Sequence, residues 1–264
     1  MKESYKDRVV IITGASSGIG REMAVQLAAQ GAKLILAARS KEGLKATSEM
    51  CHLNAENVLI TATDISNEKD CRNCVGKAVA KFGRIDVLIN NAGIGMRARF
   101  DELMDLTVLK RVVEVNFWGS VYCTHYALPY LKSTRGRIVV VISAGGKFAT
   151  PGGCGYAASK HAQTGFFDTL RIELKEEGVS VTTAFPEWVA TGISSRAPKA
   201  DGSMAGDIVP HEKNAMTASD CAQKILTAAA KRRREVIALK LKMGAATAPF
   251  LPGAIDKVCI ETFK

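Results

Sequence analysis

The stretch from Arg8 to Ala28 constrains the fold more than any other part of the sequence. It begins with a short, β-branched apolar run and continues as TGASSGIG, after which apolar residues recur at helical spacing. This order predicts a strand, a glycine turn and a helix. Gly14, Gly18 and Gly20 let the backbone turn sharply and approach a pyrophosphate held at the positive end of the helix. The spacing indicates a dinucleotide-binding turn, with an ordinary glycine-rich turn as the alternative.

Strand-like and helix-like segments alternate along the rest of the chain. Apolar strands are expected at residues 33–38, 57–62, 84–89, 137–142, 179–185 and 235–239, and helices at 41–53, 67–82, 101–113, 116–131, 156–176 and 219–230. This alternation predicts a single-domain Rossmann fold over residues 1–264, an α/β structure whose doubly wound, seven-stranded parallel sheet carries helices on both faces. No internal repeat or break in composition marks a second domain.

Two segments lie outside this alternation. Residues 186–215 are rich in small residues, polar residues and proline, and a loop of this length predicts a lid over a substrate. Residues 240–264 carry apolar residues interrupted by prolines, which predicts a tail that packs on the core or on a second subunit. An amphipathic surface that touches a membrane is the alternative for this tail.

Composition narrows the possible partners. The net charge is +10, and basic residues gather at Lys231 to Arg234, which we interpret as a solvated helix end rather than a membrane or nucleic-acid surface. No segment has the pattern of a signal peptide or a transmembrane run, and the seven cysteines lack framework spacing. These features predict a cytoplasmic protein with reduced thiols. Cys71 and Cys74 form a lone CxxC, and we expect no metal there.

The residues after the second and third strands bear on the cofactor. Arg39 and Ser40 stand where an acidic residue would bind the ribose 2′-hydroxyl of NAD, whereas arginine pairs with a 2′-phosphate. NADP(H) is therefore expected, with hydroxyl donors from Ser17 and Ser40 and with a merely solvated arginine as the alternative. Asp64 follows the third strand, where it would either meet the adenine edge of a cofactor or form a turn.

Tyr156 and Lys160 are candidates for acid–base chemistry because four residues separate them, which is about one helical turn. Moving a phenol from its ordinary pKa near 10 toward 7 takes roughly 4 kcal/mol. A cation about 4 Å away supplies roughly that much in a medium of effective dielectric near 20. Ser143 ends the fifth predicted strand, and Asn116 lies within a helical stretch, where it would kink the helix or hold a water.

These motifs together resemble the short-chain dehydrogenase/reductase family. The resemblance rests on TGxxxGxG at residues 13–20, NNAG at 90–93, Asn116, Ser143 and YxxxK at 156–160, and it extends from about Lys6 to Ile193. The stretches GREMA (20–24), ARSKE (38–42) and NFWGSVY (116–122) are also similar to the 11β-hydroxysteroid dehydrogenase-like branch. Many members of that branch begin with a hydrophobic anchor, which is not seen in this sequence.

The resemblance implies a metal-free transfer of hydride from a nicotinamide to a carbonyl carbon. Tyr156 would protonate the carbonyl oxygen, Ser143 would hydrogen-bond to that oxygen, Lys160 would lower the phenol pKa and hold the nicotinamide ribose, and Asn116 would position a relay water. The positions that match the family's cofactor contacts are Gly14, Ser16, Ser17, Gly18, Ile19, Gly20, Arg39, Ser40, Asp64, Ile65, Asn91, Ala92, Gly93, Tyr156, Lys160, Pro186, Val189 and Thr191.

One position departs from the family pattern. Family members usually continue the sixth strand with Pro-Gly, but here Glu187 follows Pro186. A carboxylate therefore stands where backbone normally passes close to the nicotinamide. Because Thr191 still matches the position that contacts the carboxamide, we expect Glu187 to point away and activity to be retained.

The resemblance and the apolar segments at 94–100, 144–155 and 186–215 predict a carbonyl reductase or alcohol dehydrogenase for a small apolar substrate such as a steroid. Two other functions remain open: an NADP(H)-sensing regulator that does not turn over, and a protein that binds a membrane surface through its basic cluster and apolar tail. Family members are commonly dimers or tetramers, so a homodimer or homotetramer is expected. No nucleic-acid partner is expected.

Overall fold

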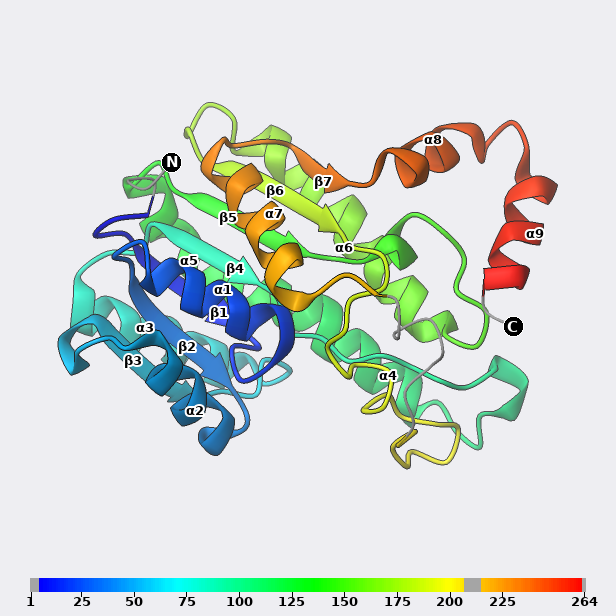
Figure 1. Cartoon of the computed structure of the whole chain (residues 1–264), viewed down its shortest axis with the longest axis horizontal. Coiled ribbons are helices and arrows are strands. Elements are labelled where there is room, and N and C mark those ends of the chain that lie inside the picture. Colours follow the sequence, from blue (N-terminus) through cyan, green and yellow to red (C-terminus); the bar gives the residue numbers. More distant parts are fainter. Residues whose placement is uncertain (1–4, 207–214, 263–264) are drawn as a thin grey trace.

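A parallel sheet forms the centre of the molecule, as the computed structural model shows for residues 5–206 and 215–262 (Figure 1). Its strand order is β3-β2-β1-β4-β5-β6-β7. The strands are β1 (Val9–Thr13), β2 (Lys33–Ala38), β3 (Val58–Ala62), β4 (Val87–Asn90), β5 (Arg137–Val141), β6 (Ser180–Phe185) and β7 (Glu235–Ile237). The order reverses direction on either side of β1, which confirms the predicted doubly wound, seven-stranded Rossmann sheet.

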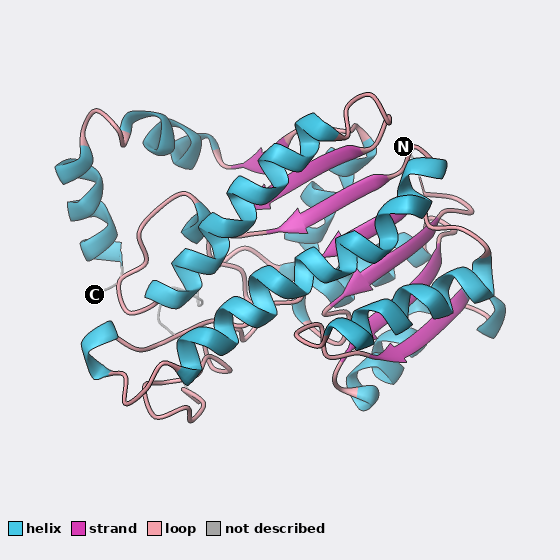
Figure 2. Cartoon of the chain, turned by 180° about the vertical axis from the view of Figure 1, so that it is seen from behind, coloured by secondary structure: helices cyan, strands magenta, loops and turns pink. Residues whose placement is uncertain are grey.

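Helices cover both faces of the sheet, so the central strands are buried on both sides and consist of continuous apolar residues. One face carries α1 (Gly18–Ala28), α2 (Lys41–Cys51) and α7 (Ala218–Ala230), which lie in front of the sheet in Figure 1. The other face carries α3 (Glu68–Phe82), α5 (Gly119–Ser133) and α6 (Cys154–Glu173), which lie in front in Figure 2. Two hydrophobic clusters, one beneath each helical layer, form the core.

The predicted helices at 101–113 and 116–131 differ from the structure. Residues Phe100–Glu102 form an isolated 3₁₀ turn, η2, and α4 begins only at Thr107 and ends at Val113. The start was predicted too early because Asp105 accepts the Thr107 N–H at 2.7 Å and so begins the helix. A π-helical segment, η3 (Glu114–Trp118), then joins α4 directly to α5. Such wide turns often occur where a helix is shaped for function.

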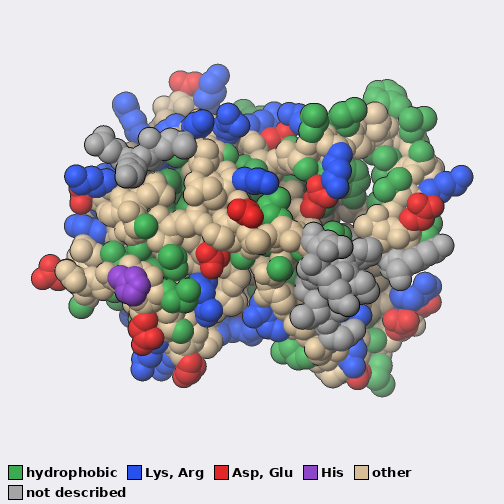
Figure 3. All heavy atoms as spheres, in the orientation of Figure 1, with side chains coloured by type: hydrophobic (Ala, Val, Ile, Leu, Met, Phe, Trp, Pro, Cys, Tyr) green, Lys and Arg blue, Asp and Glu red, His purple; other side chains and the backbone are tan. Residues whose placement is uncertain are grey.

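The chain after β7 forms two further helices, α8 (Leu239–Thr247) and α9 (Pro252–Thr262), where the sequence predicted a packing tail. Figure 3 shows hydrophobic side chains gathered over these two helices. Phe250 is 82% exposed and Met243 61%, whereas Cys259 is buried. The tail therefore packs little of its apolar surface on its own core, and packing on another subunit remains a prediction.

The basic cluster at Lys231 to Arg234 is partly structural. Arg232 donates to the carbonyls of Arg135 at 2.6 Å and Gly178 at 2.9 Å, so it joins the turns before β5 and β6. All four residues are exposed just after the end of α7, as a solvated helix end would be, and Arg232 in addition bonds to the neighbouring turns. Within the described parts of the chain, no helix is long and apolar enough to cross a membrane.

Candidate active site

The four candidate catalytic side chains come from three neighbouring elements at the carboxyl edge of the sheet. Ser143 follows β5, Tyr156 and Lys160 lie on α6, and Asn116 lies on η3. The turn after β5, η4 (Ala144–Gly146), packs on the phenol ring, because a Cβ on Gly145 would lie 3.2 Å from Tyr156 Cε1. A glycine at this position therefore permits the close approach of the β5 end to α6.

Tyr156 and Ser143 form a hydroxyl pair. Their side chains are hydrogen-bonded to each other, and Ser143 Oγ also accepts the Gly145 N–H at 3.1 Å. Burial raises the pKa of the Tyr156 phenol above its ordinary value, and the hydrogen bond with Ser143 offsets part of this rise. The phenol is therefore protonated at neutral pH and can act as a proton donor.

Lys160 is buried, with 3% of its surface exposed, and its ammonium points into the protein. It donates to the Val141 carbonyl at 3.2 Å and to Gln163 Oε1 at 3.1 Å, and it lies 5.7 Å from the centroid of the Tyr156 ring. Burial lowers the pKa of Lys160 to about 7. In this arrangement burial is the largest influence on the phenol pKa, and the ammonium is held by Gln163, so the expectation that Lys160 lowers the phenol pKa stays a prediction.

The Asn116 side chain is hydrogen-bonded to the loop after β4 and to α6. Its Oδ1 accepts the Ile94 N–H at 2.8 Å, and its Nδ2 donates to the Ile94 carbonyl at 3.0 Å and to Ser159 Oγ at 2.9 Å. Both amide protons are thereby used. On this side chain, a relay water would have to bind the second lone pair of Oδ1. A Cβ on Gly93 would lie 3.1 Å from this oxygen and 3.6 Å from Lys160 Nζ, so all three groups border one spot.

Packing within the protein requires glycine in this turn, in addition to the predicted need for room to bind a ligand. A Cβ on Gly20 would lie 2.3 Å from the Gly14 carbonyl oxygen, and one on Gly14 would lie 2.8 Å from Ala92 Cα. Gly18 has a φ of 54° and would place a Cβ 3.1 Å from Thr191 Cβ, at the start of the lid. The glycine turn, the loop after β4 and the segment after β6 are thus in direct contact.

The start of α1 suits an anionic ligand. Ser17 occupies the N-cap position without a side-chain cap, and the first turn contains no acidic residue, so its N–H groups retain their capacity to bind an anion. Ile19 packs on the core beneath this turn. The beginning of α2 is adjacent, because a Cβ on Gly43 would lie 2.9 Å from Ser16 Cβ.

Arg39 and Ser40, at the end of β2, have different surroundings. Arg39 is exposed and has no hydrogen-bond or ion-pair partner among the described residues. Ser40 caps α2 by accepting the Gly43 N–H at 3.0 Å. The free guanidinium and the open start of α1 together fit a dinucleotide that carries a 2′-phosphate.

Asp64 is held by neighbouring side chains at the carboxyl end of β3. Its Oδ1 accepts the Ser66 hydroxyl at 2.7 Å, and its Oδ2 accepts Arg111 Nη2 at 2.9 Å. Burial by itself would raise the pKa of this carboxyl, but the hydrogen bonds from Ser66 and Arg111 lower it below its ordinary value. Ile65 beside it is buried, and a Cβ on Gly119 would lie 2.6 Å from Ile65 Cδ1.

Asn91 is hydrogen-bonded to the end of β1 at the carboxyl edge of the sheet. Its Nδ2 donates to the Thr13 carbonyl at 2.9 Å, while Thr13 Oγ1 accepts the N–H groups of Asn91 at 3.0 Å and Ala92 at 3.1 Å. The NNAG motif therefore connects the ends of β4 and β1 through hydrogen bonds beside the glycine turn.

The segment after β6 closes over this edge. The Pro186 carbonyl accepts the Ala144 N–H at 2.9 Å, and Val189 is buried and bridged to Met216. The Glu187 carboxylate is paired with Lys240 Nζ of α8 at 2.8 Å, and that it points away from the cofactor stays a prediction. Part of the predicted lid, residues 207–214, lies outside the described residues.

An apolar cluster adjoins Tyr156. Met96, Ala98, Val108 and Val112 are buried together, and Tyr156, Ile94, Leu103 and Ala200 pack against them. The Arg97 N–H donates to the Pro198 carbonyl at 2.9 Å, and the Ala98 N–H donates to the Gly152 carbonyl at 2.8 Å. These contacts join the three segments that the sequence predicted to line an apolar substrate.

Sequence reasoning missed Gln163 and Arg196. Gln163 lies three residues after Lys160 on α6, so its i,i+3 spacing was a usable signal. Arg196 donates from the lid to Ser17 Oγ at 3.3 Å and to the Thr191 carbonyl at 2.9 Å, a contact for which the sequence contains no signal.

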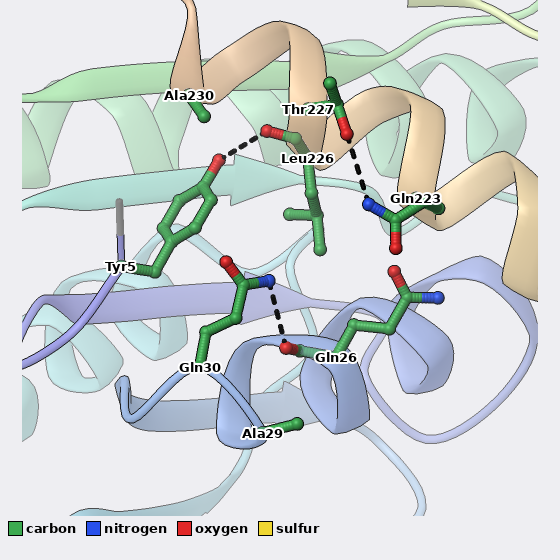
Figure 4. Close-up of a pocket in the computed structure, with 8 residues that line it drawn as sticks. All are labelled: Tyr5, Gln26, Ala29, Gln30, Gln223, Leu226, Thr227 and Ala230. Carbon is green, nitrogen blue, oxygen red and sulfur yellow. Dashed lines mark hydrogen bonds between the residues drawn. The ribbon is translucent and has the colours of Figure 1, made fainter. Parts of the chain in front are cut away.

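A separate cavity of about 300 Å³ lies between α1 and α7 (Figure 4). Two of its lining amides donate hydrogen bonds, Gln30 to the Gln26 carbonyl at 3.1 Å and Gln223 to Thr227 Oγ1 at 3.1 Å, while the side-chain oxygen of Gln26 is buried without a partner among the described residues. None of the predicted site residues lines it.

A doubly wound sheet with an open helix start beside a glycine turn binds dinucleotides. A half-buried phenol at the same edge, next to an apolar cluster, is an arrangement that suits an oxidoreductase acting with such a dinucleotide. The comparisons with known proteins agree. The model of the short chain dehydrogenase family matches residues 8–202.

Three proteins illustrate the similarity. A protein of Arabidopsis thaliana named 11-beta-hydroxysteroid dehydrogenase-like 4A is 40% identical over 228 residues, which cover 85% of this chain and 75% of the relative. A short chain dehydrogenase/reductase from Burkholderia phymatum, solved with NAD, has a TM-score of 0.78 at 25% identity, covering 96% of this chain and 93% of the other. An alcohol dehydrogenase from Thermococcus sibiricus, complexed with 5-hydroxy-NADP, has a TM-score of 0.75 at 28% identity, covering 88% and 95%.

The chain belongs to the short-chain dehydrogenase/reductase family, in the 11β-hydroxysteroid dehydrogenase-like branch, as the sequence predicted. It is an oxidoreductase of that family.

Proposed function

We propose that this protein interconverts a carbonyl and a secondary alcohol on a small apolar substrate, using NADP(H). The observation that carries the proposal is the half-buried Tyr156 phenol hydrogen-bonded to Ser143 beside the apolar cluster. In the direction of reduction a protonated phenol is the form required, because the carbonyl oxygen must receive a proton.

In this mechanism the chain's residues act on the substrate oxygen. Tyr156 donates the proton to the carbonyl oxygen, and NADPH, when bound, would supply the hydride for the carbonyl carbon that completes the two-electron reduction. Ser143 donates a hydrogen bond to the same oxygen and stabilises its developing negative charge. Lys160 holds the nicotinamide ribose, and Asn116 positions the water through which the phenol regains a proton.

The direct test is an assay of the full-length chain against steroid, retinoid, quinone and aliphatic carbonyls with NADPH and NADH side by side. We expect oxidation of NADPH with at least one apolar ketone. Fluorescence titration of NADPH distinguishes this enzyme from the alternative function, an NADP(H)-sensing regulator. Such a regulator would bind NADPH without oxidising it with any carbonyl of the panel. That outcome would reject the proposed reaction.

The preference for NADP(H) over NAD(H) is proposed from Arg39, since the solved relatives include complexes with cofactors of both kinds. Replacing Arg39 with Asp is expected to weaken NADPH binding by roughly 10- to 100-fold, because a charge-assisted hydrogen bond contributes about 1.5–3 kcal/mol. NADH binding should hold or improve. Both dissociation constants are measured by fluorescence titration.

Lys45→Asp is the matched control for this substitution. It makes the same change of charge on an exposed position of α2. If both variants lose NADPH affinity equally, the effect is one of general charge, and Arg39 does not select the 2′-phosphate.

We also propose a homodimer or homotetramer formed through aromatic side chains of η3, α5 and α6. Trp118 is 45% exposed and stacks on Tyr122 at 5.7 Å, and Phe117 contacts Phe166 at 6.0 Å. Ile172, near the end of α6, is 72% exposed. Sedimentation should show a dimer or tetramer, and Trp118→Glu should shift it toward monomer. Phe250→Glu tests the tail as an alternative interface. A shift toward monomer for Phe250→Glu alone would place the interface at α8 and α9 instead.

A further inference from the structure

A chain of buried hydrogen bonds connects Lys160 to the backbone of η3. Gln163 is 1% exposed, and its Oε1 accepts from Lys160 Nζ at 3.1 Å. Its Nε2 donates to Ser120 Oγ at 3.3 Å, and Ser120 Oγ donates to the Phe117 carbonyl at 2.7 Å. Asn116, another candidate catalytic residue, precedes this carbonyl in the chain.

The backbone sets the direction of this chain. A carbonyl oxygen only accepts, so the single proton of Ser120 is given to Phe117, and Ser120 must accept from Gln163. The amide group of Gln163 therefore points toward Ser120 and its oxygen toward Lys160. The orientation follows from Ser120 without any assumption about the charge of Lys160.

Among the described residues, no carboxylate forms an ion pair with Lys160 in place of the Gln163 contact. β5 presents the Val141 carbonyl, η3 presents Asn116, and the loop after β4 presents Gly93. The titratable group that faces it is Tyr156 on its own helix. Two cations on elements around the site are engaged elsewhere: Arg111 on α4 is paired with Asp64 at 2.9 Å, and Lys147 lies over the Phe185 ring at 4.5 Å.

We propose that Gln163 is a positioning residue for Lys160: its oxygen, oriented by Ser120, holds the ammonium against β5 and stabilises its charged form. Two of the three ammonium N–H groups are used by Val141 and Gln163, which leaves one for a further partner. The link to catalysis rests on the proposed function, but the contact between Gln163 and Lys160 is testable without any cofactor.

The first test is a double-mutant cycle in urea unfolding, with Gln163→Met, Lys160→Met and both together. Methionine keeps the approximate volume and removes the acceptor. Hydrogen bonds to charged groups are worth about twice those between neutral groups. Since burial lowers the pKa of Lys160 to about 7, we expect a coupling of roughly tenfold or more in the unfolding equilibrium constant at pH 6. This coupling should shrink at pH 9. A coupling that does not change with pH would overturn the proposal, because purely steric packing does not titrate.

The second test follows NADPH binding by fluorescence between pH 6 and 10. Gln163→Met should move the pH at which affinity falls downward by about one unit, and Gln163→Glu should move it upward. Thr182→Val, which also removes a buried polar group but lies on β6, should leave the profile of the parent unchanged.

Coincident profiles for the parent and both Gln163 variants would reject the proposal while leaving the proposed function standing. Failure of the parent to bind NADPH would instead reject the proposed function, and the unfolding cycle would still decide the role of Gln163. If Gln163→Met does not fold, Gln163→Glu and Ser120→Ala provide the same comparison. Ser120→Ala releases the orientation of the amide and is expected to shift the profile in the same direction as Gln163→Met, by less.

Discussion

Replacing Tyr156 with phenylalanine is expected to lower kcat for carbonyl reduction by roughly 10²–10⁴-fold, the usual contribution of a positioned proton donor. The phenylalanine ring keeps the contact with Gly145 and removes the hydroxyl that is paired with Ser143. NADPH affinity should change little by comparison. The measurements are steady-state kinetics with a ketone from the panel and fluorescence titration of NADPH.

Tyr126→Phe is the matched control for this variant. Its hydroxyl also donates a hydrogen bond, to Glu68 at 2.7 Å, but it lies on the exposed face of α5. It should keep the kcat of the parent. A Tyr156→Phe enzyme that reduces ketones as fast as the parent would show that another group supplies the proton, and the proposed mechanism would fall.

Lys160→Met is expected to abolish most turnover while making the protein more stable. Folding moves the pKa of Lys160 from its ordinary 10.5 to about 7, because burial disfavours the ammonium. Removing this cost should raise the free energy of unfolding by roughly 2–5 kcal/mol at pH 6. A gain of stability with a loss of activity is the pattern of a residue kept for function.

The pH dependence follows from the direction of the shift. Below pH 7 the lysine is charged in both the folded and unfolded states, so the cost of burying it is present in full. Between about pH 7 and 10.5 the unfolded chain binds the proton that the folded chain has released, so the parent gains stability as the pH rises. The advantage of Lys160→Met should therefore be largest near pH 6 and fade toward pH 10.

Urea unfolding of the parent and of Lys160→Met at several pH values measures this advantage. Lys175→Met, at an exposed position beyond α6, is the control and should show no such trend. Equal stability of Lys160→Met and the parent at pH 6 would contradict burial as the cause of the lowered pKa.

The sequence was a reliable guide to the fold wherever apolar periodicity was strong. β1 to β6 were all expected within three residues of their observed ends, because each is a short run rich in apolar and β-branched residues. The start of α4 was predicted wrongly, because the polar segment around Asp105 contains several residues able to begin a helix, and only the packed structure selects one. The π turn at Glu114–Trp118 has no sequence periodicity of its own.

In the candidate site, too, some features were predictable from the sequence and others depended on the packed structure. Residue type and spacing were enough to select Asn116, Ser143, Tyr156 and Lys160, because parallel strands end at one edge and bring their neighbouring loops together. Hydrogen-bond partners were not predictable, because they depend on side chains from distant segments. Asn91 bonds to β1, Asp64 bonds to Arg111, and Arg196 reaches the glycine turn from the lid.

The sequence by itself therefore determined the family, the doubly wound sheet and the choice of Tyr156 and Lys160 as the candidate acid–base pair. Only the tertiary structure decided the electrostatics of that pair. Burial raises the pKa of Tyr156 and lowers that of Lys160, and the Lys160 ammonium is directed to Gln163 and Val141. The physical reason is that a pKa depends on desolvation and on partners within a few ångströms, and both are established only when the strands and helices pack.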